Sequence, residues 1–274
     1  MYSAKKALEN FLAEDIGRGD ITSKLLPRQK ISVSIISRQH GIIAGVKYAK
    51  QIFVSKGCTV KVLKKDGSKV IPNQKIMIIS GPAQSVLTCE RTVLNLLSRM
   101  SGIASQTSLL VKKIQAVNRK VKLYSTRKTA PGLRLFDKEA VEIGGGHRHR
   151  MSLDKMVMIK DNHIAVTGSI SALIQKARKK YKTVEVEVEN LRGAIIAARE
   201  GASIIMLDNV PPKKISKIVR VLEKLKLRDS VKIEASGGID SKNIQSYARS
   251  GVDMISVGKI TSSVSGLDLS LEVN

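Results

Sequence analysis

The spacing of apolar residues changes near the middle of the sequence. In the first part, apolar positions recur every three or four residues over residues 3–14 and 83–117, which predicts helices. Between these stretches they alternate, as in ISVSIISR and TVKVLKK, which predicts strands. The longer helical stretch is interrupted near Ser101-Gly102, so we expect more than one helix there. The first part therefore predicts an α+β module with an open sheet.

After residue 120, short apolar runs alternate with helical segments. The runs are VKLYS, MVMIK, VEVEVE, SIIMLD, VKIEAS and MISVG. One helix–glycine–strand unit occurs twice, ending its helix at Gly201 and again at Gly251. Such alternation predicts a parallel sheet, because each crossover helix returns the chain to the same end. Six strands fit either a β/α barrel, which is then incomplete, or an open doubly wound sheet.

Polar residues and glycines lie at the end of every one of these runs. Parallel β/α folds place active sites at the carboxyl ends of their strands. We therefore expect a single site that draws on all six strands. Its candidate residues, in chain order, are Thr126, Arg127 and Lys128; Lys160; Glu187; Asp208; Ser236, Gly237 and Gly238; and Gly258.

The type of side chain indicates a small polyanion as ligand. Residues 123–164 concentrate cations, glycines and three of the four histidines, including His149 beside Arg150. Glycine turns after the last two strands let backbone N–H groups approach a phosphate. Glu187 and Asp208 are the pair expected to hold Mg²⁺ or sugar hydroxyls, because Mg²⁺ prefers one or two carboxylates together with substrate phosphates. The alternative is that these carboxylates balance neighbouring lysines.

Composition narrows the class of partner. A net charge of +25 is compatible with a nucleic-acid binder, an enzyme for anionic substrates, or a basic solvated surface. The chain has only eight aromatic residues, no Trp and no basic run of five, so no specific nucleic acid is expected. The two cysteines lack metal-ligand spacing, and the sequence shows no signal peptide, so we expect a cytoplasmic protein. It also has no apolar stretch of about 20 residues, so we expect no membrane span.

Two other chemistries remain open from the residues alone. His147 and His149 have the spacing of a possible zinc pair, although no thiol accompanies them. Lys160, at the end of a strand, fits the Schiff-base lysine of an aldolase-type barrel.

A series of strings in one order resembles the quinolinate phosphoribosyltransferase family. The strings are EDIGRGDIT, ERTVLNLLSRMSGIAS, STRKTAPGLR, KEAVEIGGGHRHRMSL, MIKDNHI, VEVEVE, IIMLDN, EASGGI, GVDMISVG and LDLSLEV. Together they cover nearly the whole chain. The resemblance implies transfer of phosphoribosyl from 5-phosphoribosyl-1-pyrophosphate to quinolinate with decarboxylation, giving nicotinate mononucleotide, pyrophosphate and CO₂ for NAD synthesis. Mg²⁺ is the implied cofactor.

The resemblance also implies a fold and an assembly. The fold is an incomplete β/α (TIM-like) barrel over residues 103–261, with an N-terminal α/β sandwich-like domain over residues 1–102 that residues 262–274 complete. The assembly is a homodimer with shared sites, in which Arg91 reaches the site of the neighbouring subunit. A surface ion pair with Glu90 is the alternative for Arg91 from the residues alone.

The implied roles follow the matching motifs. Quinolinate carboxylates are expected at Arg127, Lys128, His149, Arg150 and Lys160; Mg²⁺ and ribose hydroxyls at Glu187 and Asp208; the 5′-phosphate at Ser236, Gly237, Gly238 and Gly258. The chain departs from the family pattern at residues 261–263, where TSS replaces THS. The alternative within the same fold is the molybdenum-transport-associated relative, which is expected to lack the PGLR, GGGxxHR and KDNH strings present here.

Overall fold

The computed structural model describes residues 3–274, which form two compact units. Unit 1 comprises residues up to 108, 129–145 and 263–274, and unit 2 comprises residues 109–128 and 146–262. The sequence pattern groups residues 129–145 with the barrel, whereas here they pack within unit 1.

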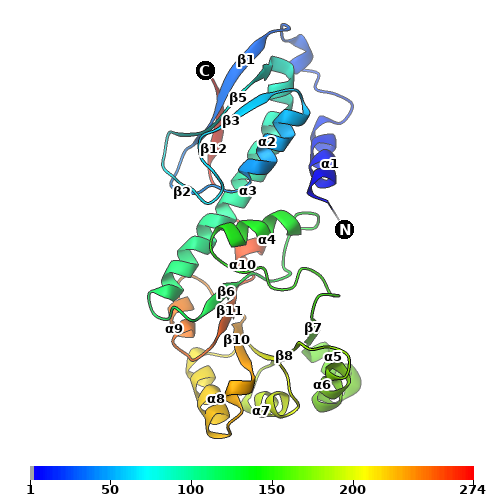
Figure 1. The fold of residues 1–274 in the computed structure, drawn as a ribbon, viewed down its shortest axis with the longest axis vertical. Helices are drawn as coiled ribbons and strands as arrows, with labels where there is room; N and C mark the ends of the chain where they lie inside the picture. The colour runs from blue at the N-terminus through cyan, green and yellow to red at the C-terminus, as the bar shows by residue number, and fades with distance from the viewer. Residues whose placement is uncertain (1–2) are drawn as a thin grey trace. The chain divides into compact units, whose positions relative to one another are not determined.

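Unit 1 is built on a four-stranded antiparallel sheet (Figure 1). Its strand order is β12 (Leu269–Val273), β1 (Lys30–Ser37), β5 (Gln74–Pro82) and β3 (Thr59–Val62), and a separate pair joins β2 (Gly41–Ile42) to β4 (Lys69–Val70). The C-terminal strand β12 thus pairs along β1, more than 200 residues away in sequence. The end of the chain completes the sheet that the first part of the chain begins.

The helices of unit 1 follow the apolar spacing. They are α1 (Ala4–Ile16), α2 (Val46–Ser55), most of α3 (Ala83–Gln115) and α4 (Arg134–Ile143). Ser3 caps α1 by accepting the N–H of Lys6 through its side chain. A two-pronged ion pair between Arg99 and the fully buried Asp137, at 2.7 and 2.9 Å, joins α3 to α4.

The predicted interruption at Ser101-Gly102 is wrong, because α3 runs unbroken from Ala83 to Gln115. The glycine is there for packing. A Cβ on Gly102 would lie 2.0 Å from the carbonyl oxygen of Ser265, so only glycine lets the returning C-terminal segment pass. The Ser101 hydroxyl accepts the N–H of Ala44 and donates to its carbonyl, which ties the helix to the loop before α2.

Unit 2 contains the expected parallel sheet. The strands are β6 (Lys122–Tyr124), β7 (Val157–Ile159), β8 (Val184–Val188), β9 (Ile204–Asp208), β10 (Lys232–Ser236) and β11 (Met254–Ser256). Their order, β6-β11-β10-β9-β8-β7, is that of a ring opened between β6 and β7. The prediction of an incomplete β/α barrel is therefore confirmed.

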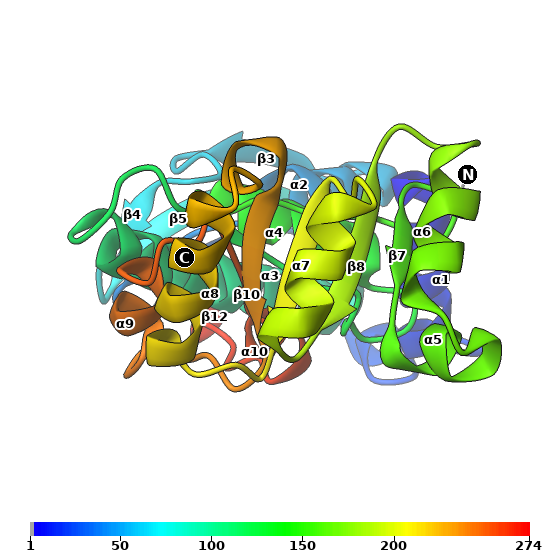
Figure 2. The ribbon, with the colours of Figure 1, turned by 90° about the horizontal axis from the view of Figure 1, so that it is seen from below.

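Helices alternate with these strands along the chain. They are α5 (Asp161–Thr167), α6 (Ile170–Arg178), α7 (Leu191–Arg199), α8 (Pro212–Lys224), α9 (Ile244–Ala248) and α10 (Lys259–Ser262). Figure 2 shows α6, α7 and α8 side by side along the sheet, and α6 and α7 contact β7, β8 and β9. The strands are consequently buried on their outer face, and their inner face is left for side chains that line the barrel.

The segment that carries the glycines and histidines lies at the opening of the ring. His147 forms a parallel bridge with Tyr124 at the free edge of β6, and the Arg150 side chain donates to the Met156 carbonyl just before β7. Residues 147–150 therefore run across the gap between β6 and β7.

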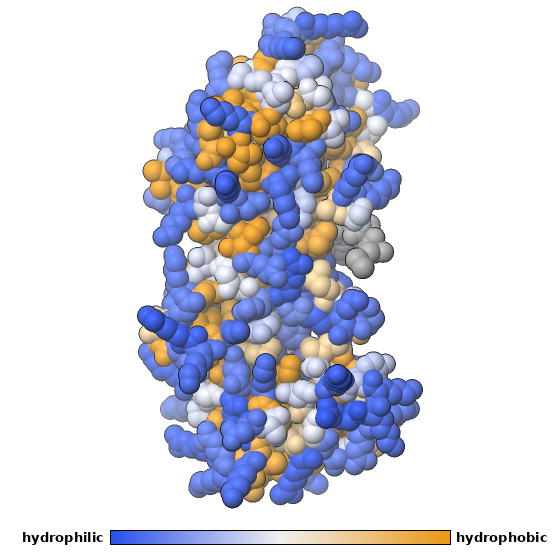
Figure 3. All heavy atoms as spheres, in the orientation of Figure 1, coloured by the Kyte–Doolittle hydropathy of each residue, from blue (hydrophilic) through white to orange (hydrophobic). Residues whose placement is uncertain are grey.

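Polar residues dominate the face of each unit drawn in Figure 3, as the basic composition predicts. Among residues 3–274, no helix has the length and apolarity required to cross a bilayer.

Candidate active site

Each barrel strand contributes two residues to its inner face. Alternate residues of a strand share one side, and paired residues of parallel strands share it too. The pairing of Met206 with both Glu187 and Glu234 therefore carries this inner face from strand to strand. On each strand we distinguish two inward positions by their place along the chain. The positions at or just after the carboxyl end, here called the upper layer, are Thr126, Lys160, Glu187, Asp208, Ser236 and Gly258; those two residues earlier, here called the deeper layer, are Tyr124, Met158, Glu185, Met206, Glu234 and Ser256.

A cavity of about 600 Å³ within unit 2 is lined by residues of both layers. Its walls include every predicted site residue except Arg91, which is exposed on α3 in unit 1. The structure thus brings together Thr126, Arg127, Lys128, His149, Arg150, Lys160, Glu187, Asp208, Ser236, Gly237, Gly238 and Gly258. A volume of this size accommodates a small ligand with several charged groups.

Two arginines at one wall lie close enough to repel each other. Burial and the nearby Arg127 lower the pKa of Arg150, and Glu185 partly offsets them. The Arg150 guanidinium donates to the Met156 carbonyl at 3.1 Å and approaches the Met158 sulfur at 3.3 Å. The Nε of Arg127 is buried and finds no hydrogen-bond partner within residues 3–274. The buried Nε of Arg127 therefore has a hydrogen left to donate, which favours an anionic ligand at this wall.

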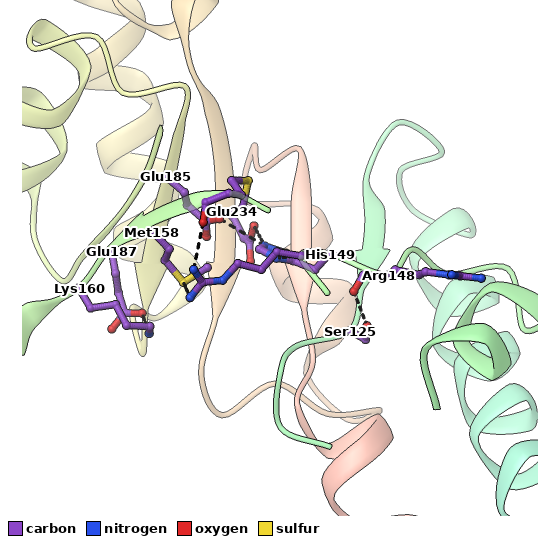
Figure 4. A network of polar contacts seen from close by, with 10 residues as sticks. Ser125, Arg148, His149, Met158, Lys160, Glu185, Glu187 and Glu234 are labelled. Atoms are coloured by element: carbon purple, nitrogen blue, oxygen red, sulfur yellow. Dashed lines mark hydrogen bonds and ion pairs between the residues drawn. The ribbon is translucent and has the colours of Figure 1, made fainter. Parts of the chain in front are cut away.

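The carboxylates of the upper layer already have polar partners. Lys160 forms an ion pair with Glu187, as Figure 4 shows. Asp208 accepts the side-chain amide of Asn209 at 2.6 Å. Glu187 and Asp208 extend from neighbouring strands into one cavity, so a bound cation would find two carboxylates there.

The opposite wall is a glycine turn after β10. Gly237 and Gly238 have φ of 86° and 62°, and successive residues of this kind turn their N–H groups toward a common point, where anions bind. A Cβ on Gly237 would lie 2.3 Å from the Asn209 side-chain oxygen. The loop after β6 is held by a hydrogen bond, which the Thr261 hydroxyl donates to the Lys128 carbonyl at 2.8 Å.

The deeper layer holds two fully buried carboxyls, Glu185 and Glu234. Burial and the adjacent Glu234 raise the pKa of Glu185 to about 9, against the opposing charges of Arg150 and Lys160. Burial and Glu234 also raise the pKa of Tyr124.

Sequence reasoning missed Glu234, which lines the cavity. It identified Asn209 and Lys259 only as polar residues at strand ends, without a role in the site. Alternation offered a signal for Glu234, because it precedes Ser236 by two positions on the same strand. Glu189, which alternation places beside Glu185 and Glu187, is exposed at the rim.

An incomplete β/α barrel with paired arginines, two carboxylates and a glycine turn around one cavity defines a class: enzymes that act on small, phosphorylated, strongly anionic substrates. Comparison with known proteins specifies the family. The family model "Quinolinate phosphoribosyl transferase, C-terminal domain" matches residues 103–272, and the corresponding N-terminal domain model matches residues 20–101. The chain belongs to the quinolinate phosphoribosyltransferase family.

Individual relatives match along the whole chain. A protein named probable nicotinate-nucleotide pyrophosphorylase (carboxylating) from Methanothermobacter thermautotrophicus is 41% identical over 271 residues, 97% of either chain. A protein of the same name from Archaeoglobus fulgidus is 44% identical over 93% of this chain and 98% of its own. The solved nicotinate-nucleotide pyrophosphorylase from Francisella tularensis superposes with a TM-score of 0.91 at 40% identity, covering 98% of this chain and 95% of that one.

Proposed function

We propose that this enzyme transfers the phosphoribosyl group of 5-phosphoribosyl-1-pyrophosphate to quinolinate and releases pyrophosphate and CO₂. The product is nicotinate mononucleotide, a precursor of NAD. The observation that carries the proposal is the arrangement of the cavity, with cations at one wall, a glycine turn at the other and two carboxylates between them. That order matches a reaction between a dicarboxylate and a phosphorylated sugar.

Quinolinate fits the wall of cations by charge. Its two carboxylates are on adjacent ring carbons, so a pair of neighbouring guanidinium groups can bind both at once. Arg127 and Arg150 are such a pair, and Lys160 lines the same cavity. Nicotinate has one carboxylate and would leave part of this positive charge uncompensated, which predicts selectivity for the diacid.

The sugar donor fits the remaining walls. Its 5′-phosphate would be bound by the backbone N–H groups of residues 236–238 and by Gly258, where a Cβ would lie 3.1 Å from the Lys128 side chain. Its pyrophosphate would lie near Lys128 and Lys160, which neutralise charge as the bond from C1 to the leaving oxygen breaks.

The ring nitrogen of quinolinate would attack C1 of the donor as pyrophosphate departs. The carboxylate next to that nitrogen then leaves as CO₂, and its electron pair stays on the ring carbon, which takes up a proton. The positive ring nitrogen stabilises that electron pair. The fixed cations hold the reactants in line, and no covalent enzyme intermediate is needed.

Glu187 and Asp208 fit a Mg²⁺ ion in number and kind of ligand. Mg²⁺ typically takes one or two carboxylates and completes its shell with substrate phosphates and water. When bound, it would supply positive charge to the leaving pyrophosphate. Because Glu187 is ion-paired with Lys160, arrival of the pyrophosphate and cation would require this pair to rearrange.

The alternatives have less support. Homologues carry the name of the carboxylating pyrophosphorylase, which disfavours the molybdenum-transport-associated relative. A Schiff-base lysine needs its amine free to attack a carbonyl, whereas the side-chain nitrogen of Lys160 is already ion-paired with Glu187. Borohydride trapping of a carbonyl substrate on Lys160 would revive the aldolase alternative.

The decisive assay follows nicotinate mononucleotide formed by purified protein from quinolinate, the sugar donor and Mg²⁺. Nicotinate replaces quinolinate in a parallel reaction, and EDTA replaces Mg²⁺ in another. Product from quinolinate alone, lost in EDTA, is the expected result. No product from quinolinate with Mg²⁺ present would refute the proposed function.

The active assembly is proposed to be a homodimer in which Arg91 completes the partner's site. Exposure of Arg91 outside the cavity-bearing unit supports this idea. Mixing Arg91→Ala subunits with Lys128→Ala subunits should recover about a quarter to a half of the turnover, because one site of each heterodimer would retain both residues. Verified heterodimers without any recovery would contradict shared sites.

A further inference from the structure

Lys259 lines the cavity, but the proposed reaction gives it no role. The other lysines and arginines of the lining belong to the segments that adjoin β6 and β7, whereas Lys259 follows β11. In the sheet, β11 lies between β6 and β10. Lys259 therefore comes from the strand next to β10, the strand that ends in the glycine turn.

The backbone around Lys259 is held in place by hydrogen bonds. The Gly258 carbonyl accepts the N–H groups of Thr261 and Ser262, each at 3.1 Å. The Thr261 hydroxyl also donates to the Lys128 carbonyl at 2.8 Å, which ties α10 to the loop after β6. Thr261 is buried, whereas Lys259 and Ser262 are exposed and line the cavity. The Lys259 side chain thus begins at a fixed point of the wall, and its long, flexible stem lets the ammonium reach a ligand.

A carboxylate draws this ammonium toward the glycine turn. Asp240 follows the turn directly after Ile239, and the Asn243 side chain fixes it there: that side chain accepts the Asp240 N–H and donates to the Gly238 carbonyl, both at 2.9 Å. Backbone hydrogen bonds, chiefly from Lys242, lower the pKa of Asp240, and the charge of Lys259 lowers it further. The ammonium of Lys259 therefore lies within electrostatic reach of the end of the turn.

The wall formed by the turn carries no charge of its own. Residues 236–239 read Ser-Gly-Gly-Ile, so they offer an anion a hydroxyl and backbone N–H groups. Ser262 lines the same cavity at the position where the family pattern has a histidine. A sugar phosphate carries about two negative charges near pH 7. A cation from the adjacent strand would compensate charge that these neutral groups leave uncompensated.

We propose that Lys259 is a further substrate-binding residue: its ammonium binds the 5′-phosphate of the sugar donor, beside the backbone N–H groups of the glycine turn. This rests on the proposed function. On binding, the ammonium exchanges a solvent-screened attraction to Asp240 for a charge-assisted hydrogen bond to phosphate. Lys128 and Lys160 remain at the pyrophosphate, so different lysines recognise the two ends of the donor.

Ribose 5-phosphate tests this assignment, because it has the 5′-phosphate of the donor and lacks the pyrophosphate. Lys259→Gln removes the charge and keeps most of the length of the side chain. We expect it to weaken the binding of ribose 5-phosphate about tenfold in calorimetry at low salt, where exposed charges are least screened. The KM for the sugar donor should rise by a similar factor. The KM for quinolinate and the inhibition constant of pyrophosphate should change less than about twofold.

Lys242→Gln is the matched control. Lys242 is also exposed and its charge also lowers the pKa of Asp240 after the backbone hydrogen bonds, but within residues 3–274 the cavity lining does not include it. Lys242→Gln should bind ribose 5-phosphate as tightly as the wild type. Lys259→Arg keeps the charge and should retain most of the binding that Lys259→Gln loses.

Three results would overturn the proposal. One is an equal loss of binding in Lys259→Gln and Lys242→Gln, which would show a general effect of surface charge. Another is a loss confined to pyrophosphate or quinolinate, which would place Lys259 at the other end of the cavity. The third is a Lys259→Gln variant with the wild-type affinity for ribose 5-phosphate and the wild-type KM for the sugar donor.

Binding of ribose 5-phosphate needs no turnover, so this inference and the proposed function fail in different ways. A wild type that makes nicotinate mononucleotide, with unchanged constants in Lys259→Gln, would refute the role of Lys259 and leave the proposed function standing. A wild type that makes no nicotinate mononucleotide, but binds ribose 5-phosphate more tightly than Lys259→Gln does, would refute the proposed function and support the phosphate contact.

Discussion

The glycine turn after β10 offers a comparison between two adjacent positions. Gly237 and Gly238 both have left-handed backbone, so alanine is strained at each, at about 1–2 kcal/mol. Their surroundings differ. A Cβ on Gly237 would meet Asn209 at 2.3, 2.6 and 2.7 Å, through its side-chain oxygen, Cγ and backbone nitrogen, whereas a Cβ on Gly238 would meet nothing within 4 Å.

Because their surroundings differ, alanine at position 237 should reduce activity more than alanine at position 238. To restore ordinary contact, Gly237→Ala must displace Asn209 or the turn by about 1 Å, and a misplacement of that size costs on the order of 100-fold in rate. Asn209 also donates to Asp208, so the displacement reaches the carboxylate proposed for Mg²⁺. We expect kcat/KM for the sugar donor to fall about 100-fold in Gly237→Ala and less than about tenfold in Gly238→Ala.

Steady-state assays with the sugar donor varied at saturating quinolinate measure the effect, and thermal unfolding measures the strain. Gly237→Ala should also lose more stability than Gly238→Ala, because only Gly237→Ala must displace Asn209. Activity is therefore compared at a temperature at which both variants remain fully folded. Adding Asn209→Gly to Gly237→Ala removes two of the three close atoms and should recover part of the loss. Equal losses in the two alanine variants, or no recovery in the double variant, would refute the account of this turn as a tightly packed phosphate cradle.

Two further predictions concern charge. Arg127→Ala and Lys160→Ala should each lower kcat/KM by roughly 100-fold or more, because each removes a fixed cation from the reacting groups. Circular dichroism should show that both variants remain folded. Near-normal turnover in either variant would remove that residue from the proposed site. For Glu185, burial and Glu234 raise the pKa from 4.5 to about 9 in the folded protein, so the native state retains a proton that the unfolded state releases. The stability due to this proton is complete below pH 4.5 and is lost as pH rises toward about 9, with a slope of at most about 1.4 kcal/mol per pH unit. Urea unfolding in EDTA should therefore show that Glu185→Gln gains stability relative to the wild type as the pH rises from 5 to 9. Glu189→Gln changes an exposed carboxyl and serves as the control. If the free energy of unfolding depends on pH in the same way in Glu185→Gln and in the wild type, the raised pKa is contradicted.

The barrel could be predicted from the sequence because its signals are local and repeated. Each strand is a short apolar run, and each ends in a polar residue or glycine at the same edge of the sheet. Repetition of that pattern in six strands predicts that residues as distant as Thr126 and Gly258 share one site, and both line the cavity. Errors in the bounds of single helices did not affect this inference.

What the sequence did not reveal depends on contacts between distant segments. The interruption expected at Gly102 is absent because the small residue serves the approach of Ser265, more than 160 positions later. Likewise, alternation identifies Glu185 as inward-facing but not as buried, since depth within a barrel depends on the stagger of neighbouring strands. Glu234 becomes notable only when β10 brings it to His149.

Residues 147–150 have a more specific role in the structure than their composition suggests. The cations and imidazoles of this segment indicate a pocket for a polyanion, but in the structure the side chains of His149 and Arg150 make different contacts. The His149 ring lies at the cavity with its Nε2 3.4 Å from a carboxyl oxygen of Glu185, while the Arg150 guanidinium donates to the Met156 carbonyl just before β7. A short strand-edge segment thus crosses the gap in an incomplete barrel and presents one cation at that gap. Arg150→Ala should therefore weaken the binding of quinolinate before it affects the phosphate end of the cavity.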